Sequence, residues 1–401
     1  MSSARRENPR HLPELDGIRG LAILGVLIAH IVLMGGIVNG TSPAMWEQVL
    51  LHSASILGGG VDLLFVLSGF LITGILLRTK QSENYFSSFY IRRMLRIFPI
   101  YYLTLTASVL VGERLAAFGN LLPAWTSWRI AYFLYLQNWP LFWHGEKVMS
   151  GMWGVYWSLA VEEQFYLIWP LVILYFSNKI VFRICAIGVP LAILLRVFLY
   201  YAYFGNNFGL LQLTSSRVEG LLLGAMCAVF MNSRQTPLPM RWIVASGTTG
   251  TVLLLAIGFL HPEELLAVGK WFELLGPTSF ALISLALVAA SQHPFPRFKK
   301  ILTQPWLRSF GKFSYGMYVY HLILIFAIRH YVVNGRTPTN GSGIPYSIAV
   351  KASMILAEIG AVYLLAKLSF DVVETRFLRL KPHFEPQNSV ISGRKTEERV
   401  L

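Results

Sequence analysis

Residues 17–38 read GIRGLAILGVLIAHIVLMGGIV and decide the fold. A helix needs roughly 20 apolar residues to cross a hydrocarbon core of about 30 Å, and this run supplies them. The residues before it are polar, the run holds a histidine, and it shows no convincing small-residue cleavage site. These features indicate a first transmembrane helix rather than a cleaved secretory signal.

The whole chain has the composition of a polytopic membrane protein. Of its 401 residues, 55% are hydrophobic and 13% are charged, against roughly 25% charged in soluble domains. The sequence therefore predicts an all-α fold, a bundle of about ten transmembrane helices. The stretch 121–153 is apolar but crowded with Trp, Tyr, Pro and Asn, so we expect it to be interfacial or re-entrant. The predicted spans begin near positions 18, 57, 97, 159, 181, 215, 242, 272, 313 and 346.

The positive charges orient this bundle. With ten spans and a cytoplasmic N-terminus, most Lys and Arg residues fall on the cytoplasmic side, as the positive-inside rule requires. We expect a multi-pass protein of the cell inner membrane with both termini cytoplasmic. It would comprise an N-terminal tail (1–17), a membrane domain (18–380) and a disordered tail (381–401). This topology explains the net charge of +14 without a nucleic-acid partner.

Charged and titratable residues inside predicted spans are the first functional candidates. Each costs at least roughly 2.5–3.5 kcal/mol at the bilayer centre, so it should face protein or water. The candidates are Arg19, His30, Asp62, Glu162, Glu163, Arg196, Arg217, Glu219, His321, Arg329, Glu358 and Glu374.

Arg19 and His30 lie on one helix, 11 residues apart. That spacing is close to three whole turns, so the two side chains share a face and lie about 16 Å apart along the axis. A cation at the cytoplasmic rim and a base near mid-membrane suit a long substrate with an anionic head and a reactive far end. The alternative is that Arg19 only anchors the helix at the membrane surface and that His30 is hydrogen-bonded within the protein core.

Three arginines precede the third predicted span. Arg93 and Arg96, at i and i+3, fall on one side of a helix, where both guanidinium groups could donate paired hydrogen bonds to phosphates. Arg92 points away from the other two. A plain positive-inside anchor explains the same pattern.

Two later motifs also leave alternatives open. Glu162 and Glu163 lie among aromatic residues at the expected outer boundary, where they could hold a sugar ring or belong to an interfacial belt. His321 closes a Tyr-rich motif that begins at Ser314, and a buried hydrogen-bond network without catalytic duty explains it equally well.

Several classes of protein lose support. Walker-type, Gly-x-Ser-x-Gly, His-Glu-x-x-His and dinucleotide-binding motifs are all missing, which argues against ATP-driven transport, serine hydrolysis and zinc proteolysis. Cys185 and Cys227 lie in apolar runs and are expected to pack in the core rather than form a disulfide or hold a metal. We expect no metal and no permanently bound cofactor.

Taken in order, the motifs resemble those of the acyltransferase-3 family of integral membrane O-acyltransferases, and they run along almost the whole chain. They are Leu15–Gly20 with His30, Gly60–Phe70, Arg92–Pro99, Trp157–Tyr166, Arg217–Gly220, Ser314–His321 and Val373–Glu374. The resemblance implies a bundle of about ten helices, acyl-CoA as the donor substrate and an extracytoplasmic carbohydrate or glycoconjugate as the acceptor. It also implies transfer through the membrane, with acetyl as the favoured acyl group.

The resemblance also implies residue roles. His30, Glu162 and Arg19 are expected to be catalytic, Glu162 being the acidic residue of the Trp-Ser-Leu motif. Arg19, Arg93 and Arg96 are expected to bind the donor. Some members carry an appended hydrolase-like domain, and a chain ending near 401 is expected to be a stand-alone transferase. Substrate-binding or supporting roles are expected for Asp62, Glu163, Arg217, His321 and Glu374.

Together these inferences give a hypothesis. The CoA phosphates bind the arginines at the cytoplasmic face, and the thioester reaches His30, which acts as general base or as acyl carrier. Glu162 would orient the acceptor or the histidine. The competing classes are a secondary transporter or flippase, for which we find no internal repeat, and a non-catalytic scaffold.

Overall fold

The computed structural model describes residues 12–34, 45–112, 123–144, 151–203, 208–261, 269–328 and 348–387. Within these ranges every regular element is helical, which confirms the predicted all-α class. The longer helices are α1 (Pro13–Met34), α2 (Met45–Leu57), α3 (Gly60–Thr79), α4 (Tyr85–Gly112), α8 (Trp157–Tyr175), α9 (Asn178–Ala202), α10 (Thr214–Arg234), α11 (Met240–Leu260), α13 (Lys270–Ser291), α15 (Pro305–Ile328) and α16 (Ile348–Ser369). The shorter ones are α6 (Pro123–Phe133), α7 (Asn138–His144), η2 (Gly151–Tyr156), η3 (Phe208–Gln212), α14 (Pro296–Leu302), η6 (Phe370–Glu374), α17 (Thr375–Leu378) and η7 (Lys381–Phe384).

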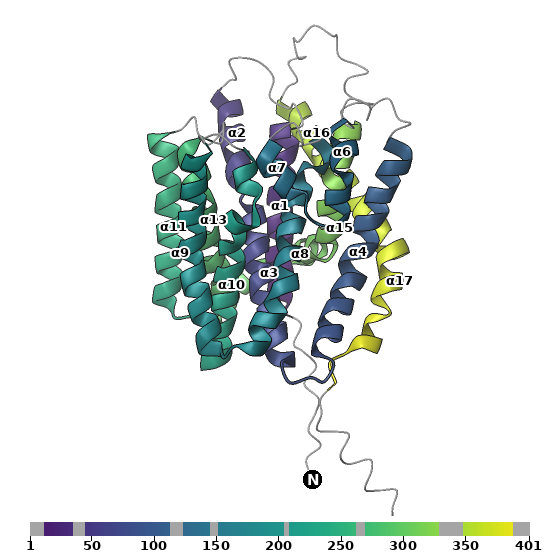
Figure 1. The fold of residues 1–401 in the computed structure, drawn as a ribbon. Helices are drawn as coiled ribbons and strands as arrows, with labels where there is room; N and C mark the ends of the chain where they lie inside the picture. The colour runs from purple at the N-terminus through teal and green to yellow at the C-terminus, as the bar shows by residue number, and fades with distance from the viewer. Residues whose placement is uncertain are drawn as a thin grey trace, which may run out of the picture.

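Seven helical stretches in the described ranges are long and apolar enough to cross a membrane. Three further long helices, α4, α8 and α10, run alongside them in Figure 1. The count of about ten spans and the cytoplasmic side of both termini stay predictions. In the stretch 121–153, the described helices have 11 residues or fewer, which is too short to span, as expected for an interfacial segment.

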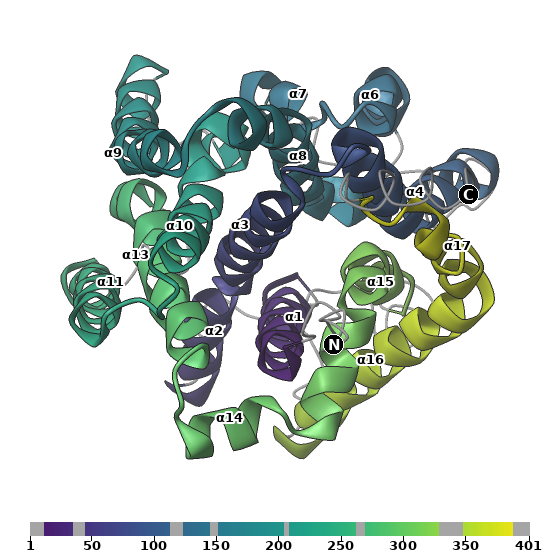
Figure 2. The ribbon, with the colours of Figure 1, turned by 90° about the horizontal axis from the view of Figure 1, so that it is seen from below.

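The helices form one bundle around α1. In Figures 1 and 2, α3 and α15 flank α1, while α9, α11 and α13 lie on one side of the bundle and α4 and α17 on the other. The free cysteines Cys185 and Cys227 are buried in apolar clusters, as predicted.

Close backbone contact sets two of the helix crossings. A Cβ added at Gly224 of α10 would lie 2.0 Å from the carbonyl oxygen of Val66 on α3. One added at Gly20 of α1 would lie 2.0 Å from the carbonyl oxygen of Leu307 on α15. Between transmembrane helices, where lipid tails weaken the hydrophobic drive to associate, such small residues allow the close packing that holds the bundle.

The two chain ends differ from the predicted boundaries. Helix α1 begins at Pro13 rather than at residue 18. The C-terminal tail was predicted to be disordered from residue 381, and this is wrong for residues 381–387, which form η7 and a hydrogen-bonded extension. Residues 388–401 lie outside the described ranges, as does the candidate Arg329.

We expect Gly224→Ala to destabilise the bundle by about 1–3 kcal/mol, because the added methyl group meets a backbone atom that cannot turn away. Thermal unfolding of the purified protein in detergent measures the effect. Gly360→Ala on α16 is the matched control, since a Cβ there meets nothing within 4 Å. Equal unfolding temperatures for the two variants would contradict the close crossing of α3 and α10.

Candidate active site

A cavity of about 220 Å³ lies among α1, α3, α4, α8 and α15. It brings together five of the residues predicted from the sequence, contributed by three helices that are far apart in the chain. These residues are Arg19 of α1, Arg93 and Arg96 of α4, and Glu162 and Glu163 of α8. The other polar side chains of the lining are Ser68, Ser158, Tyr166, Ser314, Tyr315 and Tyr318.

The arginines give the cavity its positive charge. Arg93 and Arg96 both line it, as their spacing predicted, and Arg92 does not. The Arg93 guanidinium lies 4.3 Å from the centre of the Tyr166 ring, and its buried Nε has no hydrogen-bond partner among the described residues. Arg19 lies 3.5 Å from Asp16 on its own helix. These groups therefore keep donors available for an anionic ligand.

The two carboxylates do not form a separate site at the outer boundary. Glu162 and Glu163 share the cavity with the arginines. Glu162 is within hydrogen-bond reach of Ser68 and Tyr166, whose hydroxyls contact each other, and it interacts electrostatically with Arg93. Glu162 thus offsets part of the charge of Arg93, and its role in orienting the acceptor or His30 stays a prediction.

His30 has a partner that the sequence did not reveal. Its ring centre lies 5.0 Å from that of His321 on α15, at an angle of 66°. Each Nδ1 faces a carbonyl oxygen of its own helix, that of Val26 at 2.8 Å and that of Tyr318 at 2.7 Å. In the neutral ring Nδ1 then carries the proton, and Nε2 is left as the basic atom. The Nε2 of His321 is buried and lacks a hydrogen-bond partner among the described residues.

Tyr318 lies next to both the cavity and this histidine pair. Its side chain lines the cavity, and its ring centre lies 5.5 Å from that of His321. Its hydroxyl contacts Ser158 and donates to the carbonyl oxygen of Val155 at 3.0 Å. The histidines themselves do not line the cavity.

The remaining predicted residues support the site. Arg217 of α10 forms an ion pair with Asp62 of α3 at 2.9 Å, and its guanidinium lies 5.3 Å from the centre of the Trp157 ring and 5.7 Å from that of Phe65, a cavity residue. Glu374, buried in the π-helical turn η6, interacts electrostatically with Arg96.

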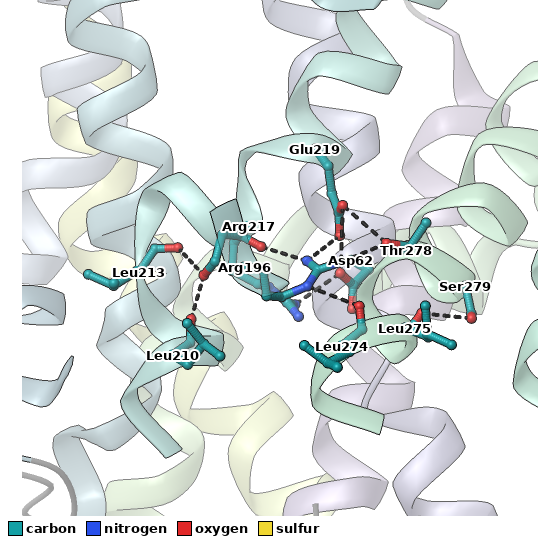
Figure 3. A network of polar contacts seen from close by, with 11 residues as sticks. Asp62, Arg196, Leu210, Leu213, Arg217, Glu219, Leu274, Leu275, Thr278 and Ser279 are labelled. Atoms are coloured by element: carbon teal, nitrogen blue, oxygen red, sulfur yellow. Dashed lines mark hydrogen bonds and ion pairs between the residues drawn. The ribbon is translucent and has the colours of Figure 1, made fainter. Parts of the chain in front are cut away.

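A second buried ion pair, Arg196 with Glu219, lies beside that of Arg217 with Asp62 (Figure 3). Neither Arg196 nor Glu219 lines the cavity. The fully buried Arg196 of α9 donates to Glu219 of α10 at 2.7 and 3.3 Å. It also donates to the carbonyl oxygens of Leu274 and Ser216 and to the hydroxyl of Thr278. These bonds join α9, α10 and α13, and no local sequence pattern could have paired the two charges.

Tyr135 was not among the predicted site residues, because it lies in the stretch 121–153 that we predicted to be interfacial. Its backbone adopts φ 54°, a conformation that non-glycine residues rarely adopt. Its ring stacks on Tyr101 at 4.2 Å, and its buried hydroxyl has no hydrogen-bond partner among the described residues. Tyr135 lies close to Tyr315 and Glu163, both of which line the cavity. Such strain is often kept at functional sites.

Comparisons with known proteins identify the family of the chain. The family model described as "Acyltransferase domain" matches residues 12–364, so the chain belongs to this family of enzymes that transfer acyl groups. It is 28% identical over 94% of its length to the peptidoglycan O-acetyltransferase OatA of Listeria monocytogenes. It is 27% identical over 88% of its length to the O-acetyltransferase OatA of Staphylococcus aureus. The chain spans 56–60% of the length of the curated relatives it matches. No solved structure matches it.

We expect Arg196→Met to cost about 3–5 kcal/mol of stability, because it leaves the Glu219 carboxylate buried without its cation. Unfolding of the purified protein measures this cost. The double variant Arg196→Met/Glu219→Leu removes both charges and should recover a large part of the loss. If the double variant is as unstable as the sum of the two single variants, the two charges do not act as a pair.

Proposed function

We propose that this protein is a membrane-embedded O-acetyltransferase that moves an acetyl group from cytoplasmic acetyl-CoA to a hydroxyl of an extracytoplasmic carbohydrate. The observation that carries this proposal is the arrangement of Arg19, Arg93 and Arg96 in one cavity, whose lining residue Tyr318 lies next to the His30–His321 pair. A relative named a peptidoglycan O-acetyltransferase supports acetyl as the group and a glycan as the acceptor.

The arginines are the proposed anchor for the donor. CoA carries its phosphates far from the thioester, and guanidinium groups are well suited to phosphates because they donate several hydrogen bonds in a fixed plane. With the phosphates held by Arg93 and Arg96, the pantetheine arm would extend along the cavity towards Tyr318. A side-chain rotation of Tyr318 would then admit the thioester to the histidines.

His30 is the proposed general base. Its Nε2 takes the proton from the acceptor hydroxyl while the hydroxyl oxygen attacks the thioester carbonyl carbon. Collapse of the tetrahedral intermediate breaks the carbon–sulfur bond, and the leaving CoA thiolate recovers the proton from the His30 imidazolium. His321, whose ring centre lies 5.0 Å from that of His30, would stabilise that imidazolium. Membership of an acyltransferase family favours this chemistry over transport or flipping.

We expect His30→Ala to lower acetyl transfer by about 10²–10⁴-fold, because the base that takes the hydroxyl proton is lost. His321→Ala should lower it by about tenfold. The measurement is release of CoA thiol by purified protein in lipid nanodiscs, with acetyl-CoA and a peptidoglycan oligosaccharide as the probe acceptor. His52→Ala is the control, because the His52 ring bonds the carbonyl of Gln48 on its own helix. Transfer by His30→Ala within twofold of wild type would remove the catalytic role.

We expect Arg93→Gln/Arg96→Gln to weaken acetyl-CoA binding by about 10–100-fold, because each lost charge-assisted hydrogen bond contributes about 1.5 kcal/mol or more. Titration of acetyl-CoA into purified protein measures the Kd. Arg183→Gln is the matched control, since Arg183 is exposed on α9 and lies outside the cavity. His30→Ala should bind the donor with unchanged affinity, and an unchanged Kd for the double variant would reject the donor site.

A further inference from the structure

The C-terminal segment after α17 is fixed against the start of α4. The side-chain amide of Asn84, just before α4, donates to the carbonyl oxygen of Glu385 at 2.9 Å and accepts from the backbone N–H of Gln387 at 2.9 Å. The backbone N–H of Glu83 donates to the carbonyl oxygen of Gln387 at 3.0 Å. Figures 1 and 2 show α17 running beside α4. These bonds place Lys381, the first residue of η7, against the arginine-bearing helix.

Lys381 lies in a field of like charge. It is half-buried, and burial lowers the pKa of its amine to about 7, with further lowering by the positive charges of Arg96, Arg93 and Arg92. Glu374 of η6 acts on it in the opposite direction. Arg92, Arg93, Arg96 and Lys381 thus gather beside one another, with Glu374 offsetting part of their charge and Glu162 and Glu163 acting on Arg93 within the cavity. Such a group of cations favours an anion with several charges.

Lys381 lies near the arginines of the cavity but is not part of its lining. Arg93 and Arg96 line the cavity, whereas Lys381 and Arg92 lie close to the same arginines but outside the lining. A ligand that fills the cavity with an uncharged arm and leaves its phosphates at the mouth would bring them to this group of cations. A polyphosphate ligand fits the charge balance better than a single carboxylate.

We propose that Lys381 is a further donor-binding residue, which contacts a phosphate of CoA at the mouth of the cavity and is held there by the contact of residues 381–387 with Asn84. This inference rests on the proposed function, because it takes CoA as the ligand. The phosphate of an anionic lipid headgroup has the same chemistry, and the experiment is designed to separate the two sources.

The experiment measures the Kd of CoA for the full chain in nanodiscs of phosphatidylcholine and, separately, of phosphatidylglycerol. We expect Lys381→Gln to weaken CoA binding by about tenfold in both lipids, and Lys381→Arg, which keeps the charge, to stay within about threefold. Lys179→Gln is the matched control: Lys179 is exposed at the start of α9, and its replacement should leave the Kd unchanged.

Asn84→Ala is the second variant, because it keeps every charge and removes the two side-chain hydrogen bonds that hold the segment. It should weaken CoA binding by about threefold or more. An unchanged Kd for Lys381→Gln overturns the inference, and so does a loss seen only in phosphatidylglycerol, which would point to a lipid headgroup. If the wild-type protein does not bind CoA in either lipid, the proposed donor itself is wrong, a result distinct from failure of the Lys381 contact.

Discussion

Charge that is buried in a helix bundle must find its partner inside the protein, and this constraint shapes the whole molecule. Hydrocarbon offers no hydrogen bonds, so an unpaired ion there costs several kcal/mol. Arg196 meets the constraint by donating to Glu219, to Thr278 and to the carbonyl oxygens of Ser216 and Leu274. Arg93 in the cavity keeps a buried Nε without a partner in the described part of the chain, as does Arg217, which is ion-paired to Asp62. Of these three, Arg93 is the one that lines the cavity, so its unused donor is the one within reach of a ligand there.

The position of the histidines outside the cavity lining has a chemical consequence for the proposed reaction. A thioester that shared one open, wet chamber with a basic imidazole would be exposed to hydrolysis, because water competes with the acceptor hydroxyl. Tyr318, bonded to Ser158 and to the carbonyl of Val155, lines the cavity and lies next to His321. Carbonyls of their own helices hold both histidine rings in a defined orientation, so the proposed reaction would need no reorganisation of the rings.

Much of this arrangement could be predicted from the sequence, for identifiable reasons. Hydropathy fixed the helical class, and helical spacing placed Arg93 and Arg96 on one side, because both depend only on neighbours along the chain. The meeting of His30 with His321, and of Arg196 with Glu219, depends on how distant helices cross, which no local pattern encodes. Tyr135 was lost for a different reason: its strained backbone is imposed by tertiary packing and leaves no mark in composition.

The arginines of α4 show how the fold turns a single-helix motif into a site. On α4 alone, Arg92, Arg93 and Arg96 would be an ordinary positive-inside anchor exposed to water and lipid headgroups. Packing α15 against α4, through the bond of the Tyr315 hydroxyl to the carbonyl of Ile97 at 2.7 Å, makes Arg93 and Arg96 part of the wall of a cavity. The π-helical turn η6 then brings Glu374 back to α4 to offset part of the charge, and it starts the segment that carries Lys381. The charge beside the cavity therefore depends on residues that follow α16, and α1 supplies Arg19 from the other end of the described chain.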